Sequence, residues 1–370
     1  MKNWDVVVIG AGIIGLSLAI ELNKRGAKVL IVEKGEPGRE ASWAAGGMLA
    51  DFPFEMPPAL RGLATASARM YPEFVRQLED ESRLKIDLRD KGALVFVNDA
   101  ELSSARNLAA EMRLENAFRV VEGLSDLEPA LDRPKACAHL TPLLLHERSV
   151  DPRHLTAAAI AAAKHRGIDF SSGNKVTELR IHGGKVDGVR TSKTQFSADK
   201  VVNCAGAWSG QIQSGQLGPT SLPTRPVKGQ MLCVVMPSKE LIRHVVRTPD
   251  VYLIPRSDGR MLIGATQEEV GFDKRTVPEA IQKLRKAALE LVPKMAEARF
   301  LEDWAGLRPG TPDNLPILGT TGMPNYFVAT GHFRDGILLA PVTARVMAQV
   351  VSGEKPALDL AACAATRFAG

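Results

Sequence analysis

The chain has 370 residues, of which 45% are hydrophobic and 24% are charged; this composition excludes a disordered or coiled-coil protein and is normal for a globular protein of about two domains. The net charge of +5 comes from dispersed residues, so no nucleic-acid groove is indicated, and no apolar run reaches the roughly 18 residues of a membrane span. The four cysteines form no C-x-x-C pair and the seven histidines show no ligand spacing, so we expect no metal site and a cytoplasmic protein with buried, reduced thiols.

The first predicted unit is a strand, a glycine turn, a helix and a second strand. The apolar run 5–9 leads into the pattern G-x-G-x-x-G at residues 10–15. A helical pattern continues to residue 24, and the apolar run 29–32 ends at Glu33. Because the glycines stand between a strand and a helix, the pattern predicts a dinucleotide-binding βαβ unit.

The glycines and the acid of this unit have separate tasks. Gly10 permits a tight exit from the strand, Gly12 lets a pyrophosphate approach the backbone, and Gly15 lets the helix pack close to the sheet. The first N–H groups of the helix attract phosphates. Glu33 can accept hydrogen bonds from ribose hydroxyls and disfavours a 2′-phosphate, so the unit predicts NAD or FAD and not NADP. The alternative is a glycine-rich turn in an α/β protein that binds no nucleotide.

Further helices and strands follow along the chain, and Asp151 is expected to cap one of the helices. The expected helices are 63–84, 100–115, 124–131, 151–166, 278–291 and 336–352. The expected strands are 91–97, 175–181, 185–191, 200–206, 225–236, 251–256, 260–265, 300–308 and 326–331. Nucleotide-binding segments thus occur at the beginning, middle and end, with β-rich segments between them. This order predicts a discontinuous cofactor domain with a second domain inserted in it.

Two arginines and one tyrosine are candidates for substrate binding. Arg308 and Arg334 both lie beside glycine turns at the ends of apolar strands, where a guanidinium can hold a carboxylate through two hydrogen bonds. The alternative for each is a structural ion pair, for example between Arg334 and Asp335. Tyr252 lies in an apolar strand, where it can donate to a substrate carboxylate or simply complete the edge of the core.

The segment 331–336 precedes the last expected helix. Its N–H groups can face the anionic edge of a flavin, or they can form an ordinary helix cap. His332 in this segment is read as a loop histidine without acid–base work. The sequence shows no nucleophile elbow, P-loop or paired carboxylate site, which suits a flavin because the cofactor itself carries the chemistry.

Five segments together resemble the D-amino-acid-oxidase-type flavoenzymes and, within that family, the glycine oxidases of the thiamine pathway. The similarity spans nearly the whole chain, and the last two segments in their order are specific. The segments are 10–15 with Glu33, 41–50, 203–209, 306–309 and 331–337.

The resemblance implies an α/β fold with a discontinuous Rossmann-type FAD-binding domain and an inserted antiparallel β-sheet substrate domain. The FAD-binding domain would comprise 1–42, 70–85, 148–218 and 303–370, and the substrate domain 43–69, 86–147 and 219–302. The residues implied for FAD are Gly10, Gly12, Ile13, Ile14, Gly15, Glu33, Lys34, Ala41, Ser42, Gly46, Gly47, Met48, Val176, His332, Phe333, Arg334, Asp335, Gly336, Ile337 and Leu338.

Two departures from related enzymes refine this expectation. Sarcosine oxidases attach their flavin to a cysteine in the stretch that corresponds to 304–319, and this chain has no cysteine there, so we expect non-covalent FAD. Asp250 and Gln267 stand where characterised glycine oxidases can carry a histidine and a methionine near the pocket.

The resemblance also implies a reaction. Arg308 would bind the substrate carboxylate with help from Tyr252 and Arg334, and hydride would pass from the α-carbon of the neutral amine to FAD. The imine would hydrolyse or be captured, and O2 would be reduced to H2O2. The expected substrates are glycine, another small or D-amino acid, or sarcosine, and we expect a homo-oligomer. The alternatives are a D-amino-acid dehydrogenase with a respiratory acceptor, a flavin module acting on modified tRNA, and a flavin-binding protein without turnover.

Overall fold

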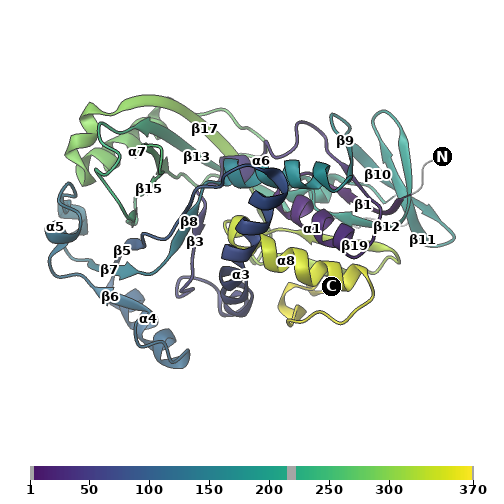
Figure 1. The fold of residues 1–370 in the computed structure, drawn as a ribbon, viewed down its shortest axis with the longest axis horizontal. Coiled ribbons are helices and arrows are strands. Elements are labelled where there is room, and N and C mark those ends of the chain that lie inside the picture. The colour runs from purple at the N-terminus through teal and green to yellow at the C-terminus, as the bar shows by residue number, and fades with distance from the viewer. Residues whose placement is uncertain (1–3, 215–221, 369–370) are drawn as a thin grey trace.

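The computed structural model describes residues 4–214 and 222–368, which form two large β-sheets and a small third one (Figure 1). The large sheets stand toward opposite ends of the long axis, with helices between them. This arrangement confirms the α/β fold class. The division into two domains stays a prediction, and those parts of it that fall on 1–3, 215–221 and 369–370 lie outside the described residues.

The first sheet contains the predicted dinucleotide unit. Its order is β10-β11-β12-β1-β2-β9, and β19 pairs with β12 and with β18. The pairs β9–β2, β2–β1, β1–β12 and β12–β19 are parallel, so these strands share one carboxyl edge, where open α/β sheets bind ligands. The strands are β1 (Trp4–Ile9), β2 (Val29–Val32), β9 (Asp169–Ser171), β10 (Val176–His182), β11 (Lys185–Thr191), β12 (Gln195–Asn203), β18 (Ile317–Thr320) and β19 (Tyr326–Thr330).

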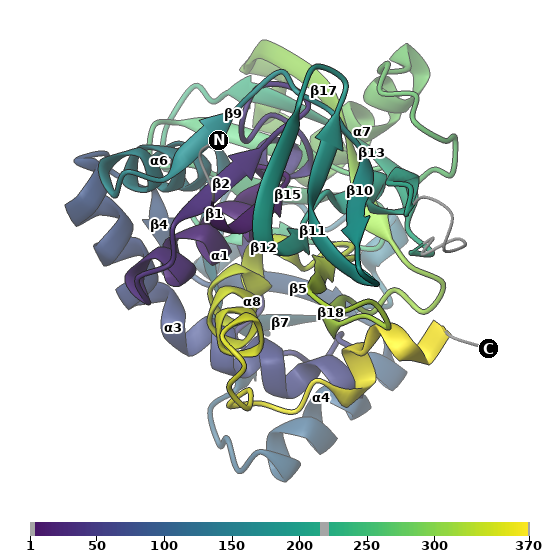
Figure 2. The same cartoon turned by 90° about the vertical axis from the view of Figure 1, so that its right-hand side faces the viewer.

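Four helices from separate parts of the chain pack together beside this sheet. In Figure 2, α1 and α8 lie against it, and α3 lies beyond them. The predicted N-cap of α6 is confirmed, because the Asp151 carboxylate accepts hydrogen bonds from the N–H groups of Arg153 and His154. These helices are α1 (Ile13–Lys24), α3 (Pro58–Ser82), α6 (Pro152–His165) and α8 (Gly336–Val351).

The second sheet is largely antiparallel and has the order β17-β13-β16-β15-β14-β5-β7-β6. The β14–β5 pair is parallel, and all other pairs of this sheet are antiparallel among the described residues, as expected for an inserted antiparallel sheet. Its strands are β5 (Ala93–Val97), β6 (Phe118–Val120), β7 (Thr141–Leu145), β13 (Arg225–Val235), β14 (Val245–Arg247), β15 (Tyr252–Pro255), β16 (Arg260–Gly264) and β17 (Arg299–Gly310).

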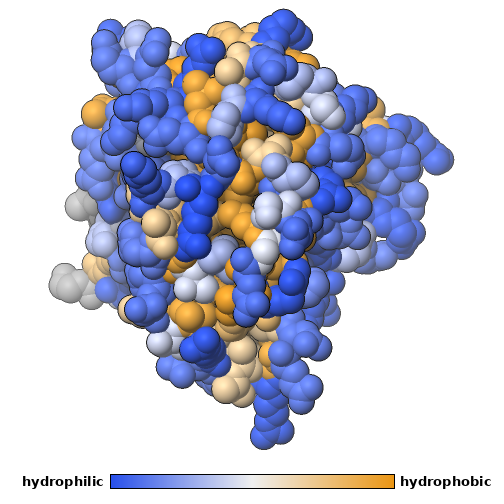
Figure 3. Space-filling view, turned by 90° about the vertical axis from the view of Figure 1, so that its left-hand side faces the viewer, coloured by the Kyte–Doolittle hydropathy of each residue, from blue (hydrophilic) through white to orange (hydrophobic). Residues whose placement is uncertain are grey.

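Seen from the end that carries the second sheet, hydrophilic residues cover most of the surface around an interrupted apolar band (Figure 3).

Smaller elements complete the second half of the molecule. The third sheet has the order β3-β8-β4, and helix α2 precedes β3. The elements are α2 (Ala41–Ala44), β3 (Met48–Leu49), β4 (Leu88–Arg89), α4 (Asp99–Glu111), α5 (Leu124–Leu127), β8 (Arg148–Val150) and α7 (Pro278–Leu291).

In the described part of the chain no helix is both long enough and apolar enough to cross a membrane. Within the same residues, no group of three or more His, Cys, Asp or Glu side chains is placed to hold a metal ion. All four cysteines are free and buried.

Candidate active site

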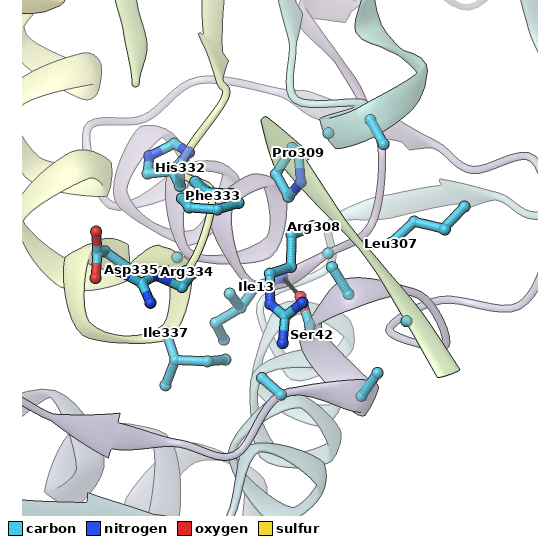
Figure 4. A pocket seen from close by; sticks show the side chains of 18 of the residues that line it. Ile13, Ser42, Leu307, Arg308, Pro309, His332, Phe333, Arg334, Asp335 and Ile337 are labelled. Atoms are coloured by element: carbon cyan, nitrogen blue, oxygen red, sulfur yellow. Dashed lines mark hydrogen bonds between the residues drawn. The ribbon is translucent and has the colours of Figure 1, made fainter. Parts of the chain in front are cut away.

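One cavity of about 510 Å³ opens at the carboxyl edge of the first sheet and extends to the second sheet. Its walls contain every residue that the resemblance implies for FAD except Gly15, and they also contain Arg308 and Tyr252. Figure 4 shows how segments far apart in the sequence meet there, with Arg308 on a strand of the second sheet, 332–335 on the loop into α8 and Ile337 in the first turn of α8.

The glycine turn after β1 is built as the sequence predicts. Gly10 has φ +101°, and a Cβ at this position would lie 2.6 Å from the carbonyl oxygen of Cys204. Gly15 does not line the cavity; a Cβ there would lie 2.1 Å from the carbonyl oxygen of Gly10, so Gly15 allows α1 to approach the strand. At the start of α1, the N–H of Ile13 donates to the Ser42 hydroxyl over 2.9 Å.

Glu33 is fixed at the tip of β2, beside this turn. Its carboxylate accepts hydrogen bonds from the N–H of Ala11 (2.8 Å) and the N–H of Gly35 (2.9 Å), and the residue is only 7% exposed. Each carboxylate oxygen has a second acceptor site. The residue therefore fits a ribose with two hydroxyls, and the absence of a Cβ at Gly12 leaves the backbone open for a pyrophosphate.

Aromatic and charged residues surround the nucleotide end of the cavity. Lys34 pairs with Glu40 at 2.9 Å, and its Nζ lies 3.1 Å from the ring centre of Trp208, which lines the cavity. Trp208 was not predicted as a site residue, because its contact with Lys34 joins positions 174 residues apart (208 − 34).

A second tryptophan site lies beside the cavity wall. The rings of Trp43 and Trp304 meet edge to face at 5.8 Å, and the Arg153 guanidinium lies over both of them. The indole N–H of Trp304 donates to the carbonyl of Ala44, which lines the cavity. The pair therefore holds the wall formed by α2.

Arg308 extends from β17 into the cavity (Figure 4). Its Nη1 donates to the carbonyl oxygens of Lys228 (3.3 Å) and Thr266 (3.1 Å), which hold the guanidinium without neutralising it. The guanidinium of Arg308 acts electrostatically on the phenol of Tyr252. Burial raises the pKa of Tyr252, while the positive charge of Arg308 and its hydrogen bond to the phenol oppose that rise.

Arg334 is an exposed residue of the cavity wall, on the loop before α8. Within the described residues, neither Arg334 nor Arg308 forms an ion pair, so the alternative pairing of Arg334 with Asp335 is not observed. Asp335 is half-buried, and burial raises its pKa to about 6 against the lowering effect of the Arg334 charge. The cavity thus contains two guanidinium groups that can receive a carboxylate.

His332 is buried and its Nε2 lies 3.1 Å from the Thr343 hydroxyl. Burial lowers its pKa to about 3, so the ring is neutral at pH 7. The next residue, Phe333, has φ +46°, and its N–H donates to the carbonyl of Pro309 over 3.0 Å. The interpretation of His332 as a loop residue without acid–base work agrees with this placement.

Arg247 and Glu55, two charged residues that the sequence did not single out, also line the cavity. Arg247 pairs with Glu55 at 2.7 Å and with the buried Glu147 at 3.0 Å, and both Arg247 and Glu55 line the cavity together with Asp250. The pKa of Glu147 is raised to about 7, mainly because the carboxyl group is buried. No local pattern predicts this cluster, because its members come from three distant segments.

Comparisons with known proteins agree with this geometry. The family profile described as "FAD dependent oxidoreductase" (DAO) matches residues 5–350. The chain is 35% identical to a glycine oxidase of Pseudomonas aeruginosa over 96% of each chain. It is 34% identical to the bifunctional protein ThiO/ThiG of Trichormus variabilis, over 95% of this chain and 53% of that protein. The crystal structure of glycine oxidase from Geobacillus kaustophilus superimposes with a TM-score of 0.91, at 31% identity, over the whole of both chains.

Proposed function

The chain belongs to the DAO family of FAD-dependent oxidoreductases, and on this premise we propose that it oxidises the amine of glycine, another small or D-amino acid, or sarcosine to an imine. The observation that carries the proposal is the pair of cavity guanidiniums, Arg308 and Arg334, which have no carboxylate partner among the described residues. A substrate carboxylate supplies that partner. The similarity to glycine oxidases supports a small substrate.

The residues around the cavity fit FAD. We propose that Glu33 binds the ribose of the adenosine, that the turn 10–15 receives the pyrophosphate, and that Gly46, Gly47 and Met48 lie against the ring system. Bound FAD supplies the acceptor for the hydride of the substrate α-C–H bond. No covalent attachment is proposed, since 304–319 contains no cysteine.

The protein side chains bind and orient the substrate. Arg308, held by two backbone carbonyls, receives the carboxylate; Tyr252 donates its phenolic hydrogen to the same group, and Arg334 adds positive charge from the opposite loop. His332 is neutral and engaged with Thr343, so we assign the amine proton to solvent and not to this ring.

The fate of the product and the electrons is part of the proposal. We propose O2 as the electron acceptor, with H2O2 as product. The similarity to the bifunctional ThiO/ThiG protein supports use of the imine for the thiazole of thiamine. The cytoplasmic location and the homo-oligomer stay predictions from the sequence.

The test is reduction of the bound flavin without air. Purified holoenzyme is mixed anaerobically with glycine, sarcosine, D-alanine or D-proline, and the loss of the yellow absorbance is followed. Bleaching by one of these compounds, followed by recovery with stoichiometric H2O2 on admission of air, is expected. No bleaching by any small amino acid contradicts the proposal, and bleaching that air does not reverse favours the dehydrogenase alternative.

A further inference from the structure

Arg256 is a charged residue that the proposed reaction does not use. It lies directly after β15, in the turn to β16, and is only 1% exposed. Among the described residues it is the largest by volume whose side chain is fully buried. Its Nη2 donates to the carbonyl oxygen of Gly46 over 2.6 Å. Its Nε and Nη1 are buried without any hydrogen-bond partner among the described residues.

The charge of Arg256 is only partly offset. The carboxylates of Asp151 and Asp87 act on it electrostatically, but no carboxylate among the described residues lies within 4 Å of its guanidinium. Asp151 is engaged by Arg260 at 2.7 Å and by the first turn of α6. Burial lowers the pKa of Arg256 to about 10, so the side chain is still charged at pH 7. Burying a charge at such a cost calls for a local reason.

The two peptides that flank Gly47 are held by residues that do not line the cavity. The Gly46 carbonyl receives Arg256, and the Gly47 carbonyl receives the N–H of Val150 over 2.8 Å. Both glycines line the cavity. A side chain is excluded at Gly47, because its φ is +78° and a Cβ there would lie 2.0 Å from the Val150 carbonyl oxygen; a Cβ on Gly46 would lie 2.7 Å from the Ile254 Cδ1 atom.

The N–H of Gly47 belongs to the same peptide group. This peptide is trans, so its N–H points opposite to the carbonyl that Arg256 holds. Within the described residues no acceptor receives this N–H. A hydrogen bond to the carbonyl polarises the peptide and strengthens its N–H as a donor.

We infer that Arg256 is a positioning residue for the flavin ring: it fixes and polarises the Gly46–Gly47 peptide so that the Gly47 N–H serves as a donor to the ring, and its charge increases the electron affinity of the bound flavin. The inference rests on the proposed function only in that the ring system must lie at 46–47. Charge and hydrogen bonds near a flavin are the means by which a protein tunes its potential.

The test uses sulfite, which adds reversibly to oxidised flavin and binds more tightly as the electron affinity of the flavin rises. The holoenzyme is compared with R256Q, which keeps a donor but loses the charge, and with R256K, which keeps the charge. R256Q is expected to bind sulfite at least fivefold more weakly, with a lower flavin midpoint potential in dye equilibration. R256K is expected to stay within about twofold of the parent protein. Equal sulfite affinity of R256Q and the parent, or equal weakening in both variants, overturns the inference.

D151N provides an independent test with the opposite sign. Asparagine can cap α6 as aspartate does, but it removes the negative charge that offsets Arg256. D151N should therefore bind sulfite more tightly than the parent, and this comparison decides the matter if R256Q does not retain FAD; an unchanged or weaker affinity overturns the inference. The sulfite titration does not require oxidation of an amino acid, so it tests the inference separately from the proposed function. A parent protein that binds sulfite but is not bleached by amino acids contradicts the proposed function alone, whereas bleaching by glycine with no effect of R256Q contradicts the inference alone.

Discussion

Backbone carbonyl groups fix the orientation of the Arg308 guanidinium in the cavity. Two carbonyl oxygens hold Nη1, and a Cβ at Gly229 would lie 2.2 Å from the same atom, so the glycine makes room for the guanidinium. These contacts fix the direction of the side chain but leave its charge available. The sequence predicted this residue from the Gly-Leu-Arg-Pro segment, while its carbonyl partners come from distant strands and could not be predicted.

We predict that R308A raises KM for the substrate about 30-fold, because loss of a charged hydrogen bond costs about 2 kcal/mol. Steady-state kinetics on FAD-saturated enzyme provide the measurement. R76A is the matched control, since Arg76 pairs with Glu73 on the exposed side of α3. An unchanged KM in R308A would remove Arg308 from the carboxylate site.

His332 gives a prediction about pH. Burial lowers its pKa from 6.5 to about 3. Between these two pH values the imidazole is protonated in the unfolded chain but neutral in the folded protein. The contribution of this residue to stability is therefore present at pH 7 and lost as the pH falls. Relative to H332Q, the parent protein should lose about 2 kcal/mol of unfolding free energy between pH 7 and pH 5.

Urea unfolding at pH 7, 6 and 5 measures this difference. H182Q is the control for replacing a histidine, because His182 is exposed at the end of β10. A constant difference between H332Q and the parent across this range would mean that His332 is not buried as a neutral ring.

The glycine turn is the element that the sequence predicted most fully. We predict that G15A destabilises the protein by about 2 kcal/mol and weakens FAD binding, because its Cβ would meet the rigid Gly10 carbonyl at 2.1 Å. G62A is the matched control: Gly62 lies in α3 with nothing within 4 Å of an added Cβ, and alanine there should stabilise the protein by about 1 kcal/mol. Thermal melting and FAD titration report both effects; equal behaviour of the two variants would be the contrary result.

Other elements differ in how well local sequence predicted them. The helix predicted at 278–291 has these bounds in α7, where Pro278 occupies the first turn and an amphipathic pattern follows. By contrast α3 begins at Pro58, five residues before the predicted start at 63 (63 − 58), and α5 ends at Leu127 instead of 131. The strands β6, β9 and β18 were missed, since runs of three or four residues carry too little periodicity and form only because a neighbouring strand is present.

The same limit applies to the active site. Gly10, Gly12, Glu33 and Arg308 were predicted as site residues because their local segments have a recognisable pattern, and all four line the cavity. Arg256, Arg247 and Glu55 were not predicted, because their contacts are with residues that only folding brings near them. The bond from Arg256 to Gly46, for example, spans 210 positions.

At the scale of the whole molecule, the cavity joins both large sheets, so cofactor binding should stabilise the chain as one unit. We predict that FAD at 100 times its dissociation constant adds about 2.7 kcal/mol to the unfolding free energy and raises the melting temperature by about 3 °C. Calorimetry of apoprotein with increasing FAD tests this. NADP is the control ligand, since Glu33 disfavours its 2′-phosphate; an equal shift with NADP would contradict the assignment of the ribose site.

The placement of the indole rings has a practical consequence. Trp208 borders the cavity, and the Trp43–Trp304 pair backs its wall through Ala44. A yellow chromophore seated between them accepts their excitation energy, so fluorescence of the empty protein should fade as it fills. Tryptophan fluorescence therefore reports how far the cavity is filled, and titration of the empty protein with the chromophore would give the number bound per polypeptide.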